Sequence, residues 1–292
     1  MTVRGTAVVA LAVLGLTACI DGSGPTPPPS LTFDLLRGSH RSIYRVRVDG
    51  ADTMRLTTDT ADNSQPTSAA GIVVFVSNRD GNAELYRMPA TGGNAIRLTN
   101  TAANEASPAL SPDGASLAYT RDDGGLPRLW ISTPNGCCAS PATSSFDFGG
   151  AIDASPTWSA GSDQVTFVST TSGSARLYTL TLSTGTIVPL QADTAPQVEP
   201  SWGADPSRLA FVTGANSGAR IAILDVTAHA VSLITPASAQ SGQPTWMSDG
   251  TIVFLQEGTT PGLVSLDPAA PGVTHPIAVG AGTPGHPSAI RP

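Results

Sequence analysis

The stretch VFVSNRDGNAELYRMPATGGNAIRLTN, from Val74 to Asn100, decides the fold. Its apolar runs are separated by Asp80-Gly81 and by a second glycine-rich segment. Asp-Gly accepts the positive φ that a tight antiparallel turn requires, so the stretch predicts short strands joined by turns. The same order of strands and turns recurs along the chain, and this stretch is therefore one copy of a repeated unit.

Six prolines mark the repeat. Each precedes a small residue and often a tryptophan, and their spacings along the chain are 42, 48, 44, 44 and 43 residues: Pro66, Pro108, Pro156, Pro200, Pro244 and Pro287. A period of about 40 to 45 residues is the size of a four-stranded propeller blade. The spacing thus predicts a radial array of sheets.

Each unit follows one pattern. A short strand with the proline comes first, then a Pro/Asp/Gly turn and an apolar strand, as in SPTWSAGSDQVTFV from Ser155. A glycine-bearing loop, a third strand and a short fourth strand complete the unit. Trp158, Trp202 and Trp246 take one equivalent position, with Leu110 in another copy. We expect these four side chains to pack between blades.

The two ends of the chain are fragments that complement each other. Residues 31–57 match strands two to four of a unit without a first strand, and residues 285–292 match a first strand alone. Pairing them would complete a sixth blade and remove exposed sheet edges. The prediction is an all-β fold, a six-bladed β-propeller over residues 31–292 whose terminal blade is closed by N- and C-terminal strands.

Composition supports this fold and excludes one class of function. Aromatic residues make up 5% and charged residues 13% of the chain, whereas Gly (30) and Pro (25) are abundant, as in proteins of many short strands. The net charge is -7, and all basic residues are arginines spread along the chain. Without a basic stripe to neutralise phosphates, we expect no nucleic-acid binding.

The N-terminus predicts export. Arg4 and the apolar run from Thr6 to Leu16 are typical of a signal peptide, here residues 1–18. The following Leu-Thr-Ala-Cys resembles the bacterial lipobox, which implies cleavage before Cys19 and its lipidation. Ile20, rather than Asp, implies the outer membrane more than the inner one. Residues 19–30, rich in Pro, Gly and Ser, predict a tether that holds the domain off the membrane of the cell envelope.

A family resemblance follows from these motifs. The order Pro, aromatic, Ser-Pro-Asp-Gly, apolar strand, Asn-Arg-Asp-Gly, Leu-Tyr, Arg-Leu-Thr resembles the PD-type, WD40-like repeat of the TolB β-propeller family. The resemblance covers roughly residues 31–292 and is strongest at Ser107–Tyr119 and Val74–Thr99. It implies the fold, because these motifs specify turns and packing rather than an activity. TolB has an additional N-terminal α/β domain and is soluble, so its role in the Tol-Pal machinery is not implied.

Catalytic and metal motifs do not emerge from the sequence. The Gly-x-Ser-x-Gly elbow of propeller-capped peptidases does not occur. The four histidines, among them His286, are too scattered for a zinc site, and Asp80, Asn82 and Glu84 lack the order of a calcium loop. We therefore expect no metal and no cofactor. Cys137 and Cys138 are adjacent, which leaves a constrained turn, a redox pair or an external partner open.

The channel of the expected propeller is the candidate binding site. In this fold the first strand of each blade lines the channel, so residues just before the repeated prolines should form its rim. Besides Ser107 and Ser155, this predicts the following residues: Gln65, Glu105, Asp153, Glu199, Gln243 and His286. Such a polar, partly acidic rim suits a cationic or hydroxyl-rich ligand, or simply holds water.

A loop with two aromatic residues lies on the same predicted face. Phe146 and Phe148 in Thr143–Gly150 are candidates for partner contact, or for packing on the blade edge. The leading hypothesis is a monomeric, membrane-anchored, non-enzymatic module of the cell envelope that binds a protein or a cell-wall glycan. The alternative is a propeller-type lyase or hydrolase acting at the channel through acidic residues and His286; a structural surface protein is a third reading.

Overall fold

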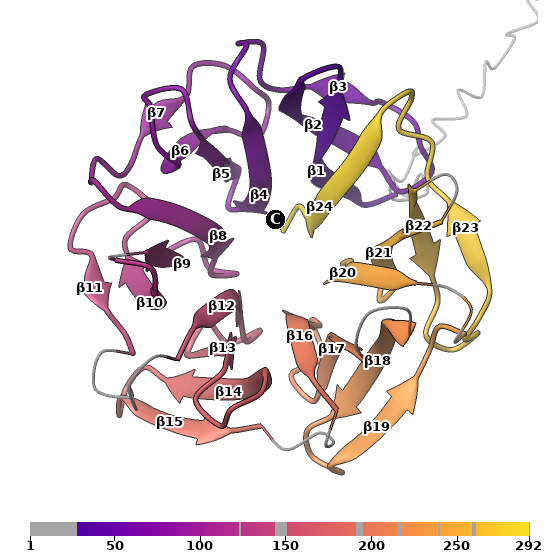
Figure 1. Cartoon of the computed structure of the whole chain (residues 1–292). Helices are drawn as coiled ribbons and strands as arrows, with labels where there is room; N and C mark the ends of the chain where they lie inside the picture. The colour runs from indigo at the N-terminus through magenta and orange to yellow at the C-terminus, as the bar shows by residue number, and fades with distance from the viewer. Residues whose placement is uncertain are drawn as a thin grey trace, which may run out of the picture.

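Six four-stranded antiparallel sheets form a closed ring in the computed structural model of the protein (Figure 1). The structure describes residues 28–122, 124–143, 151–190, 195–214, 218–236, 238, 240–258 and 261–291. None of these residues belongs to an α-helix. The predicted all-β class and six-bladed β-propeller are confirmed.

Five blades are each built from four consecutive strands. Blade 2 contains β4 (Asn63–Ala69), β5 (Ile72–Ser77), β6 (Glu84–Pro89) and β7 (Ile96–Arg97). Blade 3 contains β8 (Asn104–Leu110), β9 (Leu117–Asp122), β10 (Pro127–Ser132) and β11 (Ser140–Pro141). Blade 4 contains β12 (Asp153–Trp158), β13 (Gln164–Ser169), β14 (Arg176–Thr181) and β15 (Thr186–Pro189).

The next two blades follow the same order. Blade 5 contains β16 (Gln197–Trp202), β17 (Arg208–Thr213), β18 (Arg220–Asp225) and β19 (Ala230–Leu233). Blade 6 contains β20 (Ser241–Trp246), β21 (Ile252–Gln256), β22 (Gly262–Leu266) and β23 (Thr274–Pro276).

Blade 1 joins the two ends of the chain. Its innermost strand is the C-terminal β24 (Thr283–Ala289), followed outward by β1 (Ser30–Arg37), β2 (His40–Arg47) and β3 (Met54–Arg55). The antiparallel register brings Leu31 opposite Ala289. The predicted closure of the ring by a mixed terminal blade is confirmed.

The predicted turn residues have the required backbone conformation. Gly81, Gly114, Gly136 and Gly250 all have positive φ, between 68° and 115°. Gly136 is also required by space, because a Cβ there would lie 2.3 Å from the carbonyl oxygen of Leu98. A side chain at this turn would therefore clash with the adjacent blade.

Apolar cores fill the junctions between blades. Each of six clusters among the described residues combines side chains from two neighbouring blades, so the packing continues round the ring. Trp158, Trp202, Trp246 and Leu110 are all buried in these clusters, as the repeat predicts. Because every blade buries both faces of its sheet, a blade is not stable without its neighbours.

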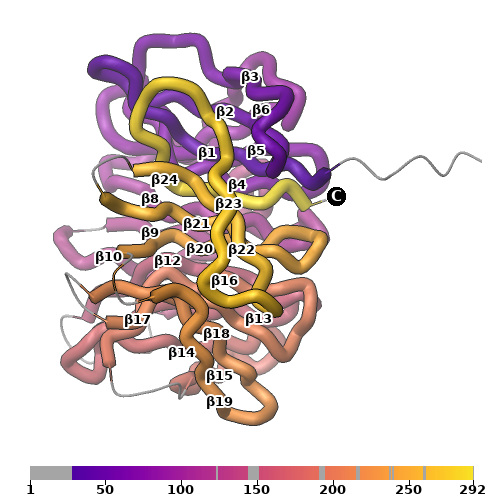
Figure 2. Tube along the Cα trace, turned by 90° about the vertical axis from the view of Figure 1, so that its right-hand side faces the viewer, coloured from indigo at the N-terminus to yellow at the C-terminus, as the bar shows by residue number. Residues whose placement is uncertain are grey.

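Both ends of the described chain lie on one face of the propeller. Figure 2 shows β24 running across the ring to this face, and the amide of Ile290 donates to the carbonyl of Ser30 at 3.0 Å. Residues near the starts of the six first strands line one cavity together, whereas residues at the ends of β16, β20 and β24 line another, so the starting ends lie at the opposite face. The channel therefore has two distinct ends.

Candidate functional site

Six residues at the start of the first strands hold a left-handed backbone. They directly precede the channel prolines and have φ between 43° and 54°: Gln65, Ser107, Ser155, Glu199, Gln243 and His286. Non-glycine residues rarely adopt this conformation, because Cβ crowds the carbonyl oxygen. We call these six residues the mouth ring.

A β-bulge explains this backbone. In every blade the register between the first and second strands shifts beside the mouth-ring residue. The proline after it has no N–H to donate, so ladder pairing is interrupted there. The bulge turns the side chain before the proline toward the channel.

The mouth ring and the six prolines line a cavity of about 300 Å³. The prolines also line a second cavity, of about 160 Å³, toward the opposite face. Of the predicted rim residues, Gln65, Glu199, Gln243 and His286 are brought together in the first cavity. All four side chains are half-buried, which leaves them accessible to a ligand.

Hydrogen bonds link part of the mouth ring from blade to blade. Oε1 of Gln65 accepts from the amide of Ser107 at 2.7 Å. Oε2 of Glu199 accepts from the amide of Gln243 at 2.6 Å, and Oε1 of Gln243 accepts from the amide of His286 at 2.6 Å. A Gln or Glu in one blade thus satisfies the backbone of the next.

A buried carboxylate orients His286. Oδ1 of Asp34, on β1, lies 2.7 Å from Nδ1 of His286. Asp34 is fully buried, and its other oxygen pairs with the guanidinium of Arg41 on β2. Asp34 and Arg41 were not predicted from the sequence. The signal that could have indicated Asp34 is a charged residue at a position where the second strands of the other repeats carry Val, Thr or Leu.

The electrostatics of the cavity centre on Glu199. Burial raises the pKa of this carboxyl, while the Gln243 amide and the charge of His286 act in the opposite direction. A partly desolvated acid near an oriented imidazole is a common feature of binding and catalytic sites. The arrangement can bind hydroxyl, amide or cationic groups, and it can also move a proton.

Two predicted rim residues lie elsewhere. Glu105 is fully buried and Asp153 nearly so, and each stands two residues before a mouth-ring serine. Asp153 accepts from the Thr143 hydroxyl, and Glu105 accepts from two threonines of the preceding blade. The prediction that Glu105 and Asp153 lie at the rim is wrong. In a regular strand, residues two positions apart point to the same side, which would put them on the side of Ser107 and Ser155. The bulge breaks this alternation.

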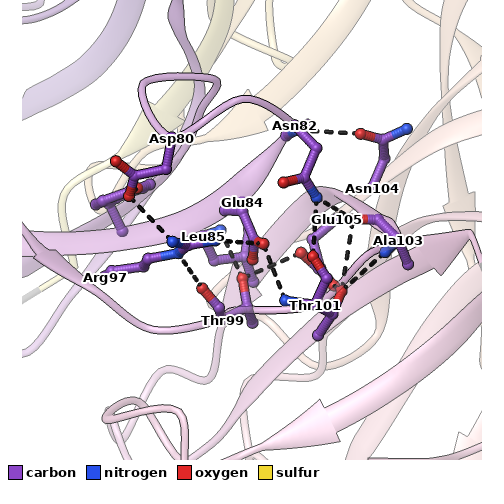
Figure 3. Close-up of polar contacts among 12 residues, drawn as sticks. Asp80, Asn82, Glu84, Leu85, Arg97, Thr99, Thr101, Ala103, Asn104 and Glu105 are labelled. Carbon is purple, nitrogen blue, oxygen red and sulfur yellow. Dashed lines mark hydrogen bonds and ion pairs between the residues drawn. The ribbon is translucent and has the colours of Figure 1, made fainter.

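Glu105 instead meets a second buried carboxyl at the junction of blades 2 and 3 (Figure 3). Its oxygens accept from Thr101 Oγ1 at 2.7 Å and from Thr99 Oγ1 at 3.1 Å. Oε1 of Glu84, also fully buried, accepts from Arg97 at 2.7 Å and from the Thr101 amide at 2.9 Å. Oε2 of Glu84 is buried with no hydrogen-bond partner among the described residues.

A shared proton accounts for this pair. Burial raises the pKa of Glu105 to about 7, and the neighbouring charge of Glu84 acts in the same direction. Burial also acts to raise the pKa of Glu84, but its interactions with Thr99, Arg97 and Glu105 hold this pKa below its usual range. Two adjacent buried carboxyls cannot both ionise cheaply, so the pair retains one proton up to about pH 7, and the lower pKa of Glu84 favours Glu105 as its site.

The opposite end of the channel is apolar. A cavity of about 350 Å³ there is lined mainly by turns of blades 3 to 6, with Trp202, Trp246 and Met247 among its residues. Arg291 lines both this cavity and the second cavity, of about 160 Å³, and it donates to the carbonyl of Trp202 at 3.3 Å. Burial lowers the pKa of Arg291.

Other features bear on the remaining predictions. In the part of the chain that the structure describes, no three His, Cys, Asp or Glu residues group as a metal site would need. The same part holds no helix long and apolar enough to cross a membrane. Cys137 and Cys138 are exposed free thiols. Residues 1–18, Cys19, Phe146 and Phe148 lie outside the described residues.

Comparisons with known proteins support a TolB-like β-propeller. Residues 28–136 match the profile of the TolB beta propeller domain. TolB from Acinetobacter baumannii superposes with a TM-score of 0.77 at 18% identity; the match covers 89% of this chain but 66% of that one. A putative TolB from Agrobacterium tumefaciens gives 0.69 at 14% identity, over 85% of this chain and 88% of that one.

An enzyme shares the fold as well. Oligogalacturonate lyase from Vibrio parahaemolyticus gives a TM-score of 0.54 at 12% identity, covering 77% of this chain and 72% of that one. No curated protein matches the sequence. At such identities the structural likeness establishes the fold alone, and the activity has to be argued from the site.

Proposed function

We propose that this protein is a non-enzymatic binding module of the bacterial cell envelope, which engages a protein or a cell-wall glycan through the mouth ring. The observation that carries the proposal is the cavity of about 300 Å³ with one half-buried polar side chain from each blade. Holding six such residues at positive φ costs roughly 1 kcal/mol each, a strain that proteins concentrate at functional sites.

The course of the chain supports an orientation toward a partner. The first described residues lie beside the C-terminal strand, on the face opposite the mouth ring. If Cys19 is lipidated and residues 19–30 act as a tether, the membrane is on that face and the mouth ring points away from it. Several acyl chains anchor a protein stably, at about 0.8 kcal/mol per buried methylene.

Photo-crosslinking in intact cells tests the binding role. A benzoyl-phenylalanine at Gln65, in the mouth ring, should capture one defined partner, and the same residue at exposed Ile96 on the outer strand β7 should not. Equal labelling from both positions would refute the mouth ring as the binding face. In the same cells, Cys19→Ser should move the protein from the membrane fraction to the soluble fraction.

The enzymatic alternative has one observation in its favour. Asp34 fixes the imidazole of His286 through Nδ1, and among the described residues no group bonds to Nε2. An imidazole held in this way, in the same cavity as Glu199, could accept a proton in a lyase or hydrolase reaction. His286→Ala separates the two functions: a binder keeps its partner capture within about threefold, whereas an enzyme loses about 100-fold or more of its turnover.

A further inference from the structure

The mouth ring is bridged on one side and open on another. Bridges run from Gln65 to Ser107, from Glu199 to Gln243 and from Gln243 to His286. The side chain of His286 turns to Asp34, so it does not continue the ring. Among the described residues, bridges from blade 3 to blade 4 and from blade 4 to blade 5 are also absent.

Short side chains explain the open side. Ser107 and Ser155 occupy the positions from which a Gln or Glu would reach the next blade. Among the described residues, no side chain accepts a hydrogen bond from the amide of Ser155 or of Glu199. Both residues line the cavity, so two backbone donors and two serine hydroxyls are gathered on one wall.

The bridged side shows which chemical group fits such a donor. Every bridge ends in a side-chain oxygen of Gln or Glu, at 2.6 to 2.7 Å from the next amide. A ligand that fills the open side therefore needs the same planar acceptor. The Glu199 carboxylate on this wall and the net charge of -7 disfavour an anion, which leaves a neutral carboxamide.

We infer that the open side of the mouth ring recognises the carboxamide of an Asn or Gln side chain on a protein partner. This inference rests on the proposed function, and it names the chemistry of that site. The cavity of about 300 Å³ is large enough for one such side chain. The partner's amide oxygen takes the place that Gln65 and Gln243 oxygens take elsewhere in the ring, and its NH₂ group can donate to a serine hydroxyl or to Glu199.

The test uses a double variant that supplies the two absent bridges of the mouth ring. In Ser107→Gln/Ser155→Gln, glutamines should bridge blades 3, 4 and 5, since Gln65 and Gln243 already adopt φ of 52° and 54° at equivalent positions. The probe is N-acetyl-glutamine methylamide at millimolar concentration, followed by amide NMR shifts of the full chain. From the shift changes of the Ser155 and Glu199 amides, the glutamine probe should bind about fivefold more tightly than the methionine analogue. This ratio is equivalent to one net hydrogen bond.

The remaining outcomes are decisive. In the double variant the glutamine probe should no longer shift Glu199, while its melting temperature should equal or exceed that of the wild type. Equal shifts with the methionine analogue, or an unchanged response of the double variant, would overturn the inference. Tighter binding of the glutamate analogue would overturn the choice of a carboxamide. If Gln65 crosslinks a partner but the probe does not bind, only this inference fails; if crosslinking also fails, the proposed function fails.

Discussion

Blade 1 and the five continuous blades differ at one equivalent position. In each blade, one residue of the second strand pairs with the residue just before the mouth-ring residue. In blade 1, whose second strand is β1, this residue is Asp34, which pairs with Gly285. In the continuous blades this position holds Val76, Thr120, Val168, Val212 and Leu255. Blade 1, whose first two strands β24 and β1 are not consecutive in the chain, thus carries a buried charge where the other blades carry a mainly apolar side chain.

This difference shows how the ring is closed. In blades 2 to 6 a tight turn ties the first strand to the second, whereas β24 is held to β1 by pairing and side-chain contacts alone. Asp34 joins β1 to His286 on β24 and to Arg41 on β2. Such a network specifies one register, because a slip would leave the buried carboxylate of Asp34 unpaired.

The largest effect is expected from removing β24. Deleting residues 283–292 leaves β1 as an open edge and removes Ala289 from the core between blades 6 and 1. The loss should be about 5 kcal/mol or more, enough to abolish cooperative unfolding in calorimetry. Adding the 283–291 peptide should partly restore the transition; an unchanged melting temperature would show that closure is dispensable.

Asp34→Ala should have the next largest effect. It leaves Arg41 and His286 without their buried partner, at a cost of about 3 kcal/mol in urea unfolding. Asp34→Val, the residue of blades 2, 4 and 5, should recover at least half of this loss. Asp52→Asn, which weakens an exposed pair with Arg47 and keeps a residue type that tolerates the φ of 54° at this position, is the control and should cost less than about 0.5 kcal/mol. Equal costs at Asp34 and Asp52 would contradict a closing role.

Glu105→Gln tests the proton shared by Glu84 and Glu105 at the junction of blades 2 and 3, which follow each other in the chain. The pKa of Glu105 is raised to about 7 in the folded state, so the folded protein binds more protons than the unfolded chain between about pH 4.5 and 7. The stability from this group is present at low pH and is lost as pH rises through 7. The variant should therefore gain about 1–3 kcal/mol relative to wild type between pH 5 and 8. A constant difference across this range would refute the shared proton.

The smallest effects concern hydroxyls that join blades. Thr245 accepts from the Ala289 amide at 3.2 Å at the closing junction, and Ser201 accepts from the Trp246 amide at 3.3 Å between continuous blades. Thr245→Val and Ser201→Ala should each cost about 1 kcal/mol in thermal unfolding, because the same bond is lost. A much larger cost at Thr245 would show that closure depends on this bond more than its geometry implies.

The repeat made much of this architecture predictable. Six spaced prolines, the Asp-Gly turns and the two complementary end fragments led to the blade number and the closing strand. Four rim residues followed from their place before a proline. Glu105 and Asp153 were misplaced because a bulge, which changes the direction of side chains, leaves no period-two signal in the sequence.

The sequence by itself determined which strands form and how many blades there are, because alternation, turn residues and repeat length are local properties of the chain. The tertiary structure alone decided which polar groups meet. The contact of Asp34 with His286 joins residues 252 positions apart, and the pairing of Glu84 with Glu105 depends on how two blades pack. Proton sharing and ring bridging arise only at those distances, since desolvation and hydrogen bonding act between groups that the closed ring brings together.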